Sequence, residues 1–166
     1  MTDHAELIHT FYDAFGRKDY AAMADCYHPD IHFSDPVFED LYGDEAKAMW
    51  HMLCLQGEDL MVTVSDVEAD DDTGSAHWTA VYTFTPTGRT VRNQIDASFE
   101  FEDGKIIRHV DAFDLWRWLR QAVGWSGVAV GWTSSAQEKV RDTGMKGLDK
   151  FLDQHPEYQR SEPTDD

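Results

Sequence analysis

The sequence predicts an α+β domain in which N-terminal helices pack on one face of an antiparallel sheet. Apolar residues recur at helical spacing before Gly57, and the period changes to two beyond it. Helical spacing returns after residue 115, which adds extra C-terminal helices. A run of helices followed by a meander of strands indicates this class of fold.

Turn and capping residues set the limits of the expected elements. Asp3 with Glu6 resembles a capping box at the start of the first helix. Pro29 ends the second helix, because the residue before a proline avoids the helical conformation. Asp72-Thr-Gly and Pro86-Thr-Gly separate strands. We expect helices at 3–16, 19–27 and from 44, a short strand at 31–36, strands at about 60–69, 75–85, 90–102 and 105–115, and helices at 115–123 and about 134–153.

The composition favours one acidic globular domain that does not bind nucleic acid or membranes. The 166 residues include 32 Asp and Glu against 14 Lys and Arg, which gives a formal net charge of -18. Nucleic acid and anionic membranes both require a basic surface, so this balance argues against either as a partner. The longest apolar stretches are shorter than a bilayer span and no signal peptide is recognisable, so we expect a soluble, cytoplasmic protein.

Neither a metal nor a cofactor is expected. Cys26 and Cys54 lie within helical patterns, belong to no Cys-x-x-Cys motif and are expected to be buried free thiols. His28 and His32 lie on either side of a proline-containing turn and match no compact spacing of metal ligands.

The most informative segment is a predicted hairpin around Asp103-Gly104. This dipeptide supplies the two positive-φ residues of a tight turn. With these two residues as the loop, Glu102 pairs with Lys105, and Asp96 lies directly opposite Asp111. Two carboxylates so placed repel each other, which requires a shared proton, a cation or a polar site that uses them. A three-residue loop would instead move Asp111 to the other face.

This register gives the hairpin one polar and one apolar face. The pattern alone leaves open which of the two faces the core. The polar face carries Gln94, Asp96, Ser98, His109, Asp111 and Phe113, and the apolar face carries Ile95, Ala97, Phe99, Val110 and Ala112.

The order of elements resembles the nuclear transport factor 2-like superfamily. Three helices, a short strand with Asp-Pro and a four-strand meander carry the resemblance over roughly residues 4–118. It implies a cone-shaped α+β barrel at 1–118, with a helical extension at 119–166 packed on the same domain and a flexible tail at 156–166. It also implies that the polar hairpin face lines a pocket and that the outer sheet face forms a homodimer.

Three enzyme branches of this superfamily are similar to the chain. Ser34-Asp35-Pro36-Val37 and Ile95-Asp96-Ala97-Ser98-Phe99 stand where ketosteroid isomerase has its general base and its protonated acid. The isomerase's first-helix tyrosine corresponds to Phe11, so another tyrosine would have to replace that donor, the candidates being Tyr12, Tyr27 and Tyr82.

Limonene-epoxide hydrolase is similar through Pro86-Thr-Gly-Arg89 and the segment 104–115, which places a catalytic aspartate at Asp111. Its Arg and Asp on an earlier strand correspond to Trp78 and Ala80, and this difference disfavours epoxide hydrolysis. The SnoaL-like polyketide cyclases use an acid with neighbouring polar groups, an arrangement compatible with Asp111 and His109.

These resemblances imply a pocket for acid/base chemistry. We expect Asp35 to act as the base, Asp96 to donate a hydrogen bond as a protonated acid, and Asp111 with His109 to hold or relay the proton. An apolar cone would favour the neutral forms of these acids. The expected substrate-binding residues are Phe11, Phe15, Trp50, Trp78, Tyr82, Gln94, Ser98 and Phe113.

Two functions fit this sequence. The first is a cofactor-independent isomerase, cyclase or lyase that moves a proton on a small hydrophobic carbonyl compound. The second is a non-catalytic module of the same fold that binds a small hydrophobic molecule or forms a dimer. Loss of the isomerase tyrosine favours the second function, whereas Asp35, Asp96 and Asp111 favour the first.

Overall fold

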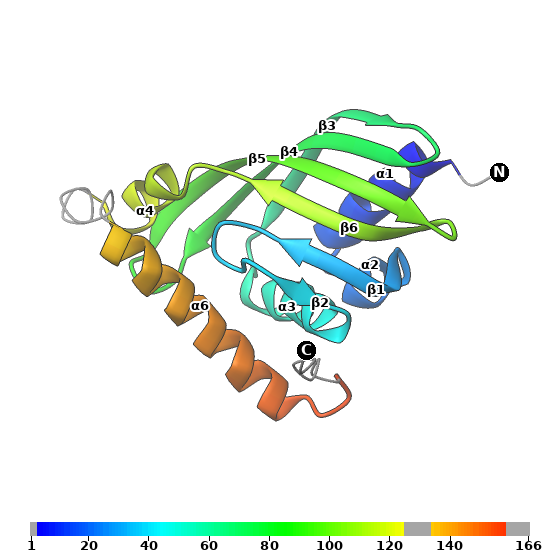
Figure 1. Ribbon diagram of the computed structural model, residues 1–166. Helices are drawn as coiled ribbons and strands as arrows, with labels where there is room; N and C mark the ends of the chain where they lie inside the picture. The colour runs from blue at the N-terminus through cyan, green and yellow to red at the C-terminus, as the bar shows by residue number, and fades with distance from the viewer. Residues whose placement is uncertain (1–2, 125–133, 159–166) are drawn as a thin grey trace.

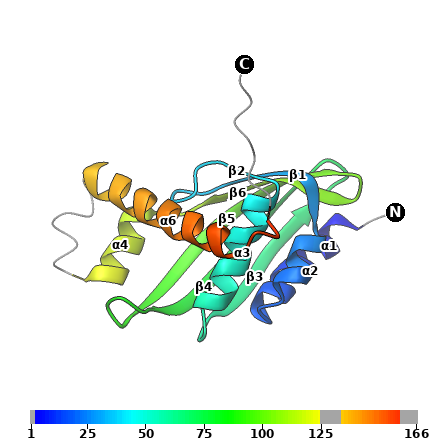
Figure 2. The ribbon, with the colours of Figure 1, turned by 90° about the horizontal axis from the view of Figure 1, so that it is seen from below.

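The computed structural model describes residues 3–124 and 134–158 and shows the expected α+β architecture (Figure 1). Helices α1, α2 and α3 lie on one side of a curved six-stranded sheet, and α6 runs beside α3 (Figure 2). The elements are α1 (His4–Gly16), α2 (Tyr20–Asp25), β1 (Tyr27–Ser34), β2 (Leu41–Tyr42), α3 (Asp44–Gln56), β3 (Met61–Ala69), β4 (Thr73–Phe84), β5 (Arg89–Glu102), β6 (Lys105–Ala112), α4 (Leu115–Val123) and α6 (Ser134–Gln154).

The sheet is mixed, whereas the sequence predicted an antiparallel one. Its order is β2-β1-β6-β5-β4-β3, and β1 pairs with β6 in parallel. The second helix also ends earlier than predicted, because the Cys26 carbonyl accepts a hydrogen bond from the Ile106 amide and the chain joins the sheet at Tyr27. The start of the first helix is confirmed, since Asp3 caps the amides of Ala5 and Glu6.

The Asp103-Gly104 turn is confirmed, but the register beyond it differs from the prediction. Both turn residues have positive φ and Glu102 pairs with Lys105. Phe101 then pairs with Ile106 but Glu100 pairs with Arg108, which leaves Ile107 as the extra residue of a β-bulge. Past the bulge, every residue of β6 is displaced by one position relative to β5.

The predicted facing pair of Asp96 and Asp111 is therefore wrong. Asp111 lies opposite Ala97, and Asp96 lies opposite Ala112. A one-residue displacement exchanges the faces of a strand, so Asp111 points to the interior while the Asp96 side chain is 84% exposed.

The predicted division of the hairpin into a polar inner and an apolar outer face is also wrong. The interior receives Ile95, Ala97 and Phe99 from β5 together with His109 and Asp111 from β6. The outer face carries Gln94, Asp96, Ser98, Val110 and Ala112. A homodimer through the outer face stays a prediction, but Ile95, Ala97 and Phe99 belong to the core and cannot form it.

Helix α6 packs against the loop that follows β1. Gly144 allows this approach, because a Cβ at that position would lie 2.7 Å from Val37 Cγ1. Arg141 Nε donates to the Pro36 carbonyl at 2.9 Å and lies 3.1 Å from Glu39 Oε1. Helix α6 thus packs against the loop between β1 and β2, and the division of the chain at residue 118 stays a prediction. The link with Trp125 and Trp132, and the tail beyond Tyr158, lie outside the described residues.

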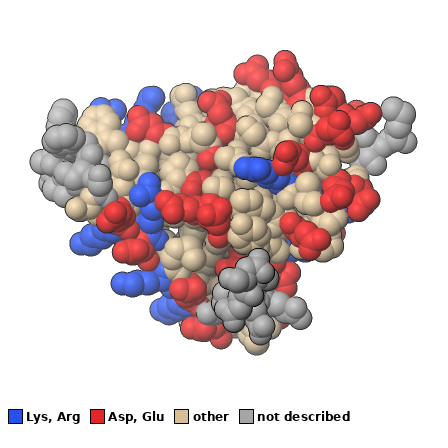
Figure 3. Space-filling view, viewed as in Figure 1, with Lys and Arg blue, Asp and Glu red and all other residues tan. Residues whose placement is uncertain are grey.

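Acidic side chains spread over most of the face shown in Figure 3, and basic ones gather along α6. Both cysteines are buried free thiols, as predicted. Within 3–124 and 134–158, no helix is long and apolar enough to cross a bilayer.

Candidate functional site

A chain of hydrogen bonds crosses the interior from α3 to β4. Trp50 Nε1 donates to the Tyr27 hydroxyl at 2.8 Å, and that hydroxyl lies 2.8 Å from His109 Nδ1. His109 Nε2 lies 2.9 Å from Asp111 Oδ1, which also accepts from Trp78 Nε1 at 3.3 Å. All five side chains are buried. We call Trp50, Tyr27, His109, Asp111 and Trp78 the buried network.

One arrangement of hydrogens satisfies every donor in the buried network. An indole nitrogen can only donate, so the Tyr27 oxygen accepts from Trp50 and its own hydrogen goes to His109 Nδ1. His109 then carries its hydrogen on Nε2 and donates it to Asp111. Burial, followed by the charge of Asp111, raises the pKa of Tyr27 well above its ordinary value, so the hydroxyl keeps its hydrogen. A neutral His109 therefore orients Asp111 as a proton acceptor.

Aromatic rings enclose His109. Phe11 and Phe33 meet it edge-on at centroid distances of 5.6 and 5.1 Å. Trp50 stacks on it at 5.9 Å and Phe99 lies at 4.6 Å. The side chain of His109 is 0% exposed and that of Asp111 is 3% exposed. Both members of this pair are therefore shielded from solvent by the surrounding rings.

The hydroxyl of Tyr12, on α1, lies close enough to Asp111 to be affected by its charge. The Tyr12 ring packs against Trp78 with 5.4 Å between centroids. The hydroxyl is buried and has no hydrogen-bond partner among the described residues. Burial raises its pKa well above the ordinary value, and the charge of Asp111 adds to the effect. Because most buried polar groups are paired, this hydroxyl is a candidate donor to a bound ligand.

Asp35 lies in the loop between β1 and β2 and is partly buried. Its Oδ1 accepts from the amides of Val37 and Phe38 at 2.7 and 2.6 Å. Burial raises the pKa of Asp35 to about 7, and the charge of Asp111 adds to this, although the two amides act in the opposite direction. A carboxyl with this pKa can both give and take a proton at neutral pH.

The structure brings together most, but not all, of the expected site residues. Phe11, Phe15, Trp50 and Trp78 join His109 and Asp111 in the interior. Phe113 packs against the same core, and Tyr82 accepts a hydrogen bond from Trp118 Nε1 at 2.6 Å.

Asp96, Gln94 and Ser98 do not join the site, because the bulge in β6 leaves them on the outer face of the sheet. Asp96 pairs there with His77 at 2.9 Å. The predicted role of Asp96 as a buried neutral donor is therefore wrong.

The sequence indicated Tyr12 and Tyr27 only as candidate substitutes for the missing tyrosine. Trp50 and Trp78 were expected to line the pocket, but their hydrogen bonds to Tyr27 and Asp111 were not predicted. Alternation along β1 was a weak signal that the Tyr27 side chain points to the interior, because Tyr27 lies an even number of residues before Phe33. The prediction that Tyr27 ends a helix concealed this signal. Tyr12 follows Phe11 on α1, and only the tertiary packing shows that both side chains are buried.

A separate surface groove of about 490 Å³ lies between α6 and the loop after β1. Four acidic residues contribute to its lining, which consists of Val37, Glu39, Asp40, Glu138, Arg141, Asp142 and Met145. No member of the buried network borders it, so this groove is distinct from the candidate site.

The chain belongs to the SnoaL-like domain family, whose match spans residues 8–109. The match contains Tyr12, Tyr27, Asp35 and His109 and ends two residues before Asp111. No curated protein matches the sequence.

Solved structures share the fold. TsrD from Streptomyces laurentii is 25% identical, with a TM-score of 0.62 over 72% of this chain and 93% of its own. IdmH from Streptomyces antibioticus, a proposed polyketide cyclase, is 20% identical, with a TM-score of 0.61 over 70% and 95%. An LEH-like epoxide hydrolase from M. tuberculosis is 17% identical, with a TM-score of 0.58 over 75% and 93%. An NTF2-like protein from Burkholderia pseudomallei is 16% identical, with a TM-score of 0.62 over 74% of this chain and 99% of its own. The chain therefore has the nuclear transport factor 2-like fold.

Two tyrosine substitutions test the hydrogen bonding of the site. Tyr27→Phe leaves Trp50 Nε1 and His109 Nδ1 without their shared partner, so we expect a loss of about 1–3 kcal/mol in the free energy of unfolding. Tyr12→Phe is the matched control, because it removes a hydroxyl that has no partner, and we expect no loss. Urea denaturation at pH 7 measures both. Equal destabilisation by the two variants would contradict the hydrogen bonding described here.

The raised pKa of Asp35 predicts how the free energy of unfolding changes with pH. The folded protein holds the Asp35 proton more tightly than the unfolded chain does, since the pKa rises from 3.8 to about 7. Its contribution to stability is therefore complete below about pH 4 and is lost as the pH rises through about 7. Asp35→Asn keeps an oxygen for the two amides and does not titrate. We expect the free energy of unfolding of the natural protein to fall relative to this variant between pH 4 and 7, whereas a constant difference would contradict the raised pKa.

Proposed function

We propose that the protein is a cofactor-independent acid/base enzyme that moves a proton on a small hydrophobic carbonyl compound. The buried network carries this proposal, because it holds a carboxylate inside an aromatic shell with a histidine behind it. Burial of a charge is costly unless it is paired, and a fold does not need such a group for packing alone. Sites that transfer protons do need one, since the base must be held within hydrogen-bond reach of its substrate.

In this proposal Asp111, not Asp35 as the resemblance implied, is the base, because His109 holds it in the aromatic interior. Asp111 removes a proton from the carbon next to the substrate carbonyl. The electrons of the C–H bond pass to the carbonyl oxygen, which becomes an enolate. The Tyr12 hydroxyl donates a hydrogen bond to that oxygen and replaces the donor that the isomerase branch has at the position of Phe11. Asp111 then returns the proton to carbon, and Asp35 exchanges protons with the substrate oxygen or with solvent.

Isomerase, cyclase and lyase reactions share this first step and differ in what the enolate does next. Structural similarity favours a carbonyl substrate, because three of the solved structures that share the fold, IdmH among them, are proposed polyketide cyclases. The aromatic lining favours an apolar substrate that stacks on rings.

The density of aromatic packing supports a second candidate function, a binding module without chemistry. Trp50 lies within 5.0 Å of Phe15 and 6.2 Å of Trp78, measured between ring centroids. Such a shell can hold a hydrophobic molecule without any reaction. This candidate leaves the orientation of Asp111 by His109 without a purpose, so we place it second.

Exchange of carbon-bound hydrogen for deuterium tests the proposal before the natural substrate is known. A panel of small aromatic and alicyclic ketones is incubated with the protein in D₂O, and NMR follows the signal of the hydrogen next to the carbonyl. We expect catalysed exchange for at least one ketone. We expect Asp111→Asn to slow it by about 10²–10⁴-fold, the range of a general base.

Asp96→Asn is the matched control, because Asp96 lies on the neighbouring strand but on the outer face. We expect this variant to exchange at the rate of the natural protein. Ketones that bind without exchange would favour the binding module, and equal rates for Asp111→Asn and the natural protein would remove Asp111 from the mechanism.

A further inference from the structure

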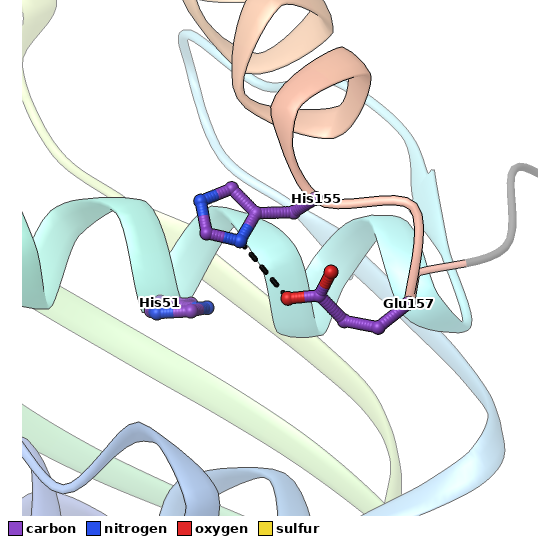
Figure 4. Close-up of side chains that lie close together, drawn as sticks. All are labelled: His51, His155 and Glu157. Atoms are coloured by element: carbon purple, nitrogen blue, oxygen red, sulfur yellow. Dashed lines mark hydrogen bonds and ion pairs between the residues drawn. The ribbon is translucent and has the colours of Figure 1, made fainter.

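Three side chains of types that can bind metal ions lie together where α3 meets the segment that follows α6 (Figure 4), and their burial ranges from buried His51 to exposed Glu157. His51 comes from α3, and His155 and Glu157 come from the turn after α6. One ligand atom from each lies within 4.8 Å of the others. Two of the three residues lie outside the part of the chain that the family match covers.

We propose that His51, His155 and Glu157 bind a divalent transition-metal ion, with Zn²⁺ as the best fit. Two imidazoles and one carboxylate are a ligand set that Zn²⁺ takes in proteins, with water completing the tetrahedron. Oxygen-seeking ions such as Ca²⁺ and Mg²⁺ do not favour two imidazoles. The site would join the C-terminal segment to the core of the domain.

The surroundings of the rings resemble the outer shell of a metal site. His51 Nδ1 lies 2.9 Å from the Tyr158 hydroxyl. When Nδ1 donates its hydrogen to that oxygen, Nε2 carries the lone pair that a cation requires, and metal-bound histidines are usually fixed in this way. Tyr20 stacks on His51 at 3.5 Å and Phe151 stacks on His155 at 4.0 Å, so both rings are held in place.

The ligand atoms are close to, but not yet at, the spacing of a bound ion. His155 Nδ1 and Glu157 Oε1 are 2.9 Å apart. Ligands of one tetrahedral Zn²⁺ lie roughly 3.3 Å from each other, given bond lengths of about 2 Å. Because these two atoms are already close, the widest separation, up to 4.8 Å, includes His51 and must close. The side chain of Glu157 is exposed, and a small shift of the segment after α6 toward α3 would bring the three ligand atoms together. The same exposure leaves a path for the ion and for water.

Metal titration of the tag-free protein, after removal of metals by EDTA and dialysis, tests the proposal. We expect one Zn²⁺ per chain by calorimetry, and visible ligand-field absorption when Co²⁺ replaces it. We also expect Zn²⁺ at about 100 times its Kd to raise the Tm by on the order of 5–10 °C, because the ion binds the folded state.

Single substitutions distinguish Zn²⁺ binding at this site from a general attraction of cations to the acidic surface. We expect His155→Gln and Glu157→Gln to weaken Zn²⁺ binding at least tenfold and to abolish the Co²⁺ absorption. Both positions are accessible, so these variants should fold. His9→Gln, at an exposed position on α1, is the matched control and should bind as the natural protein does. Absence of binding to the natural protein, or equal affinity in all four proteins, would overturn the proposal.

Discussion

The inward orientation of His109 and Asp111, on which the buried network depends, is set by a single extra residue in β6. Without the bulge at Ile107, both side chains would point out of the sheet and the interior would receive Arg108 and Val110 instead. The bulge turns two polar residues toward the aromatic side chains of α1 and α3. Every other contact of the buried network follows from this orientation, including those of Tyr27 and Trp78.

Polar groups in such an interior are stable only when they are paired. A neutral histidine between a tyrosine hydroxyl and a carboxylate uses both ring nitrogens, and the two indole nitrogens complete the set. The buried network therefore rigidifies the site and fixes the direction of each proton. Tyr12 is different, because its hydroxyl is left without a partner among the described residues. Asp111, held through Oδ1 by His109 and Trp78, lies near this unpaired donor, which is a suitable arrangement for holding a carbonyl compound.

Much of the fold could be predicted from the sequence, because periodicity, caps and the Asp103-Gly104 turn act locally. The helices at the two ends, the meander and the family resemblance all depend on such signals. The parallel pairing of β1 with β6 could not be predicted, because it joins segments far apart in the chain. The bulge escaped prediction for a different reason, since Ile107 fits either register and nothing in the local sequence marks it as extra.

The candidate site was predicted in part for the same reasons. His109, Asp111 and Asp35 were identified from their motifs, and Asp96 was assigned to the wrong face because its position was counted across the bulge. The cluster of His51, His155 and Glu157 has no sequence signature, because its members come from α3 and from the turn after α6, which only the packing of α6 on α3 brings together.

Tyr27 and His109 present Asp111 as a proton acceptor only if the His109 ring carries its hydrogen on Nε2, which ¹⁵N NMR of the ring can determine. The two ring nitrogens of a neutral histidine have distinct chemical shifts, which report the nitrogen that carries the hydrogen. We expect hydrogen on Nε2 and a bare Nδ1 at pH 7. Hydrogen on Nδ1, alone or together with Nε2, would contradict this arrangement, since the Tyr27 hydroxyl could then no longer donate to His109.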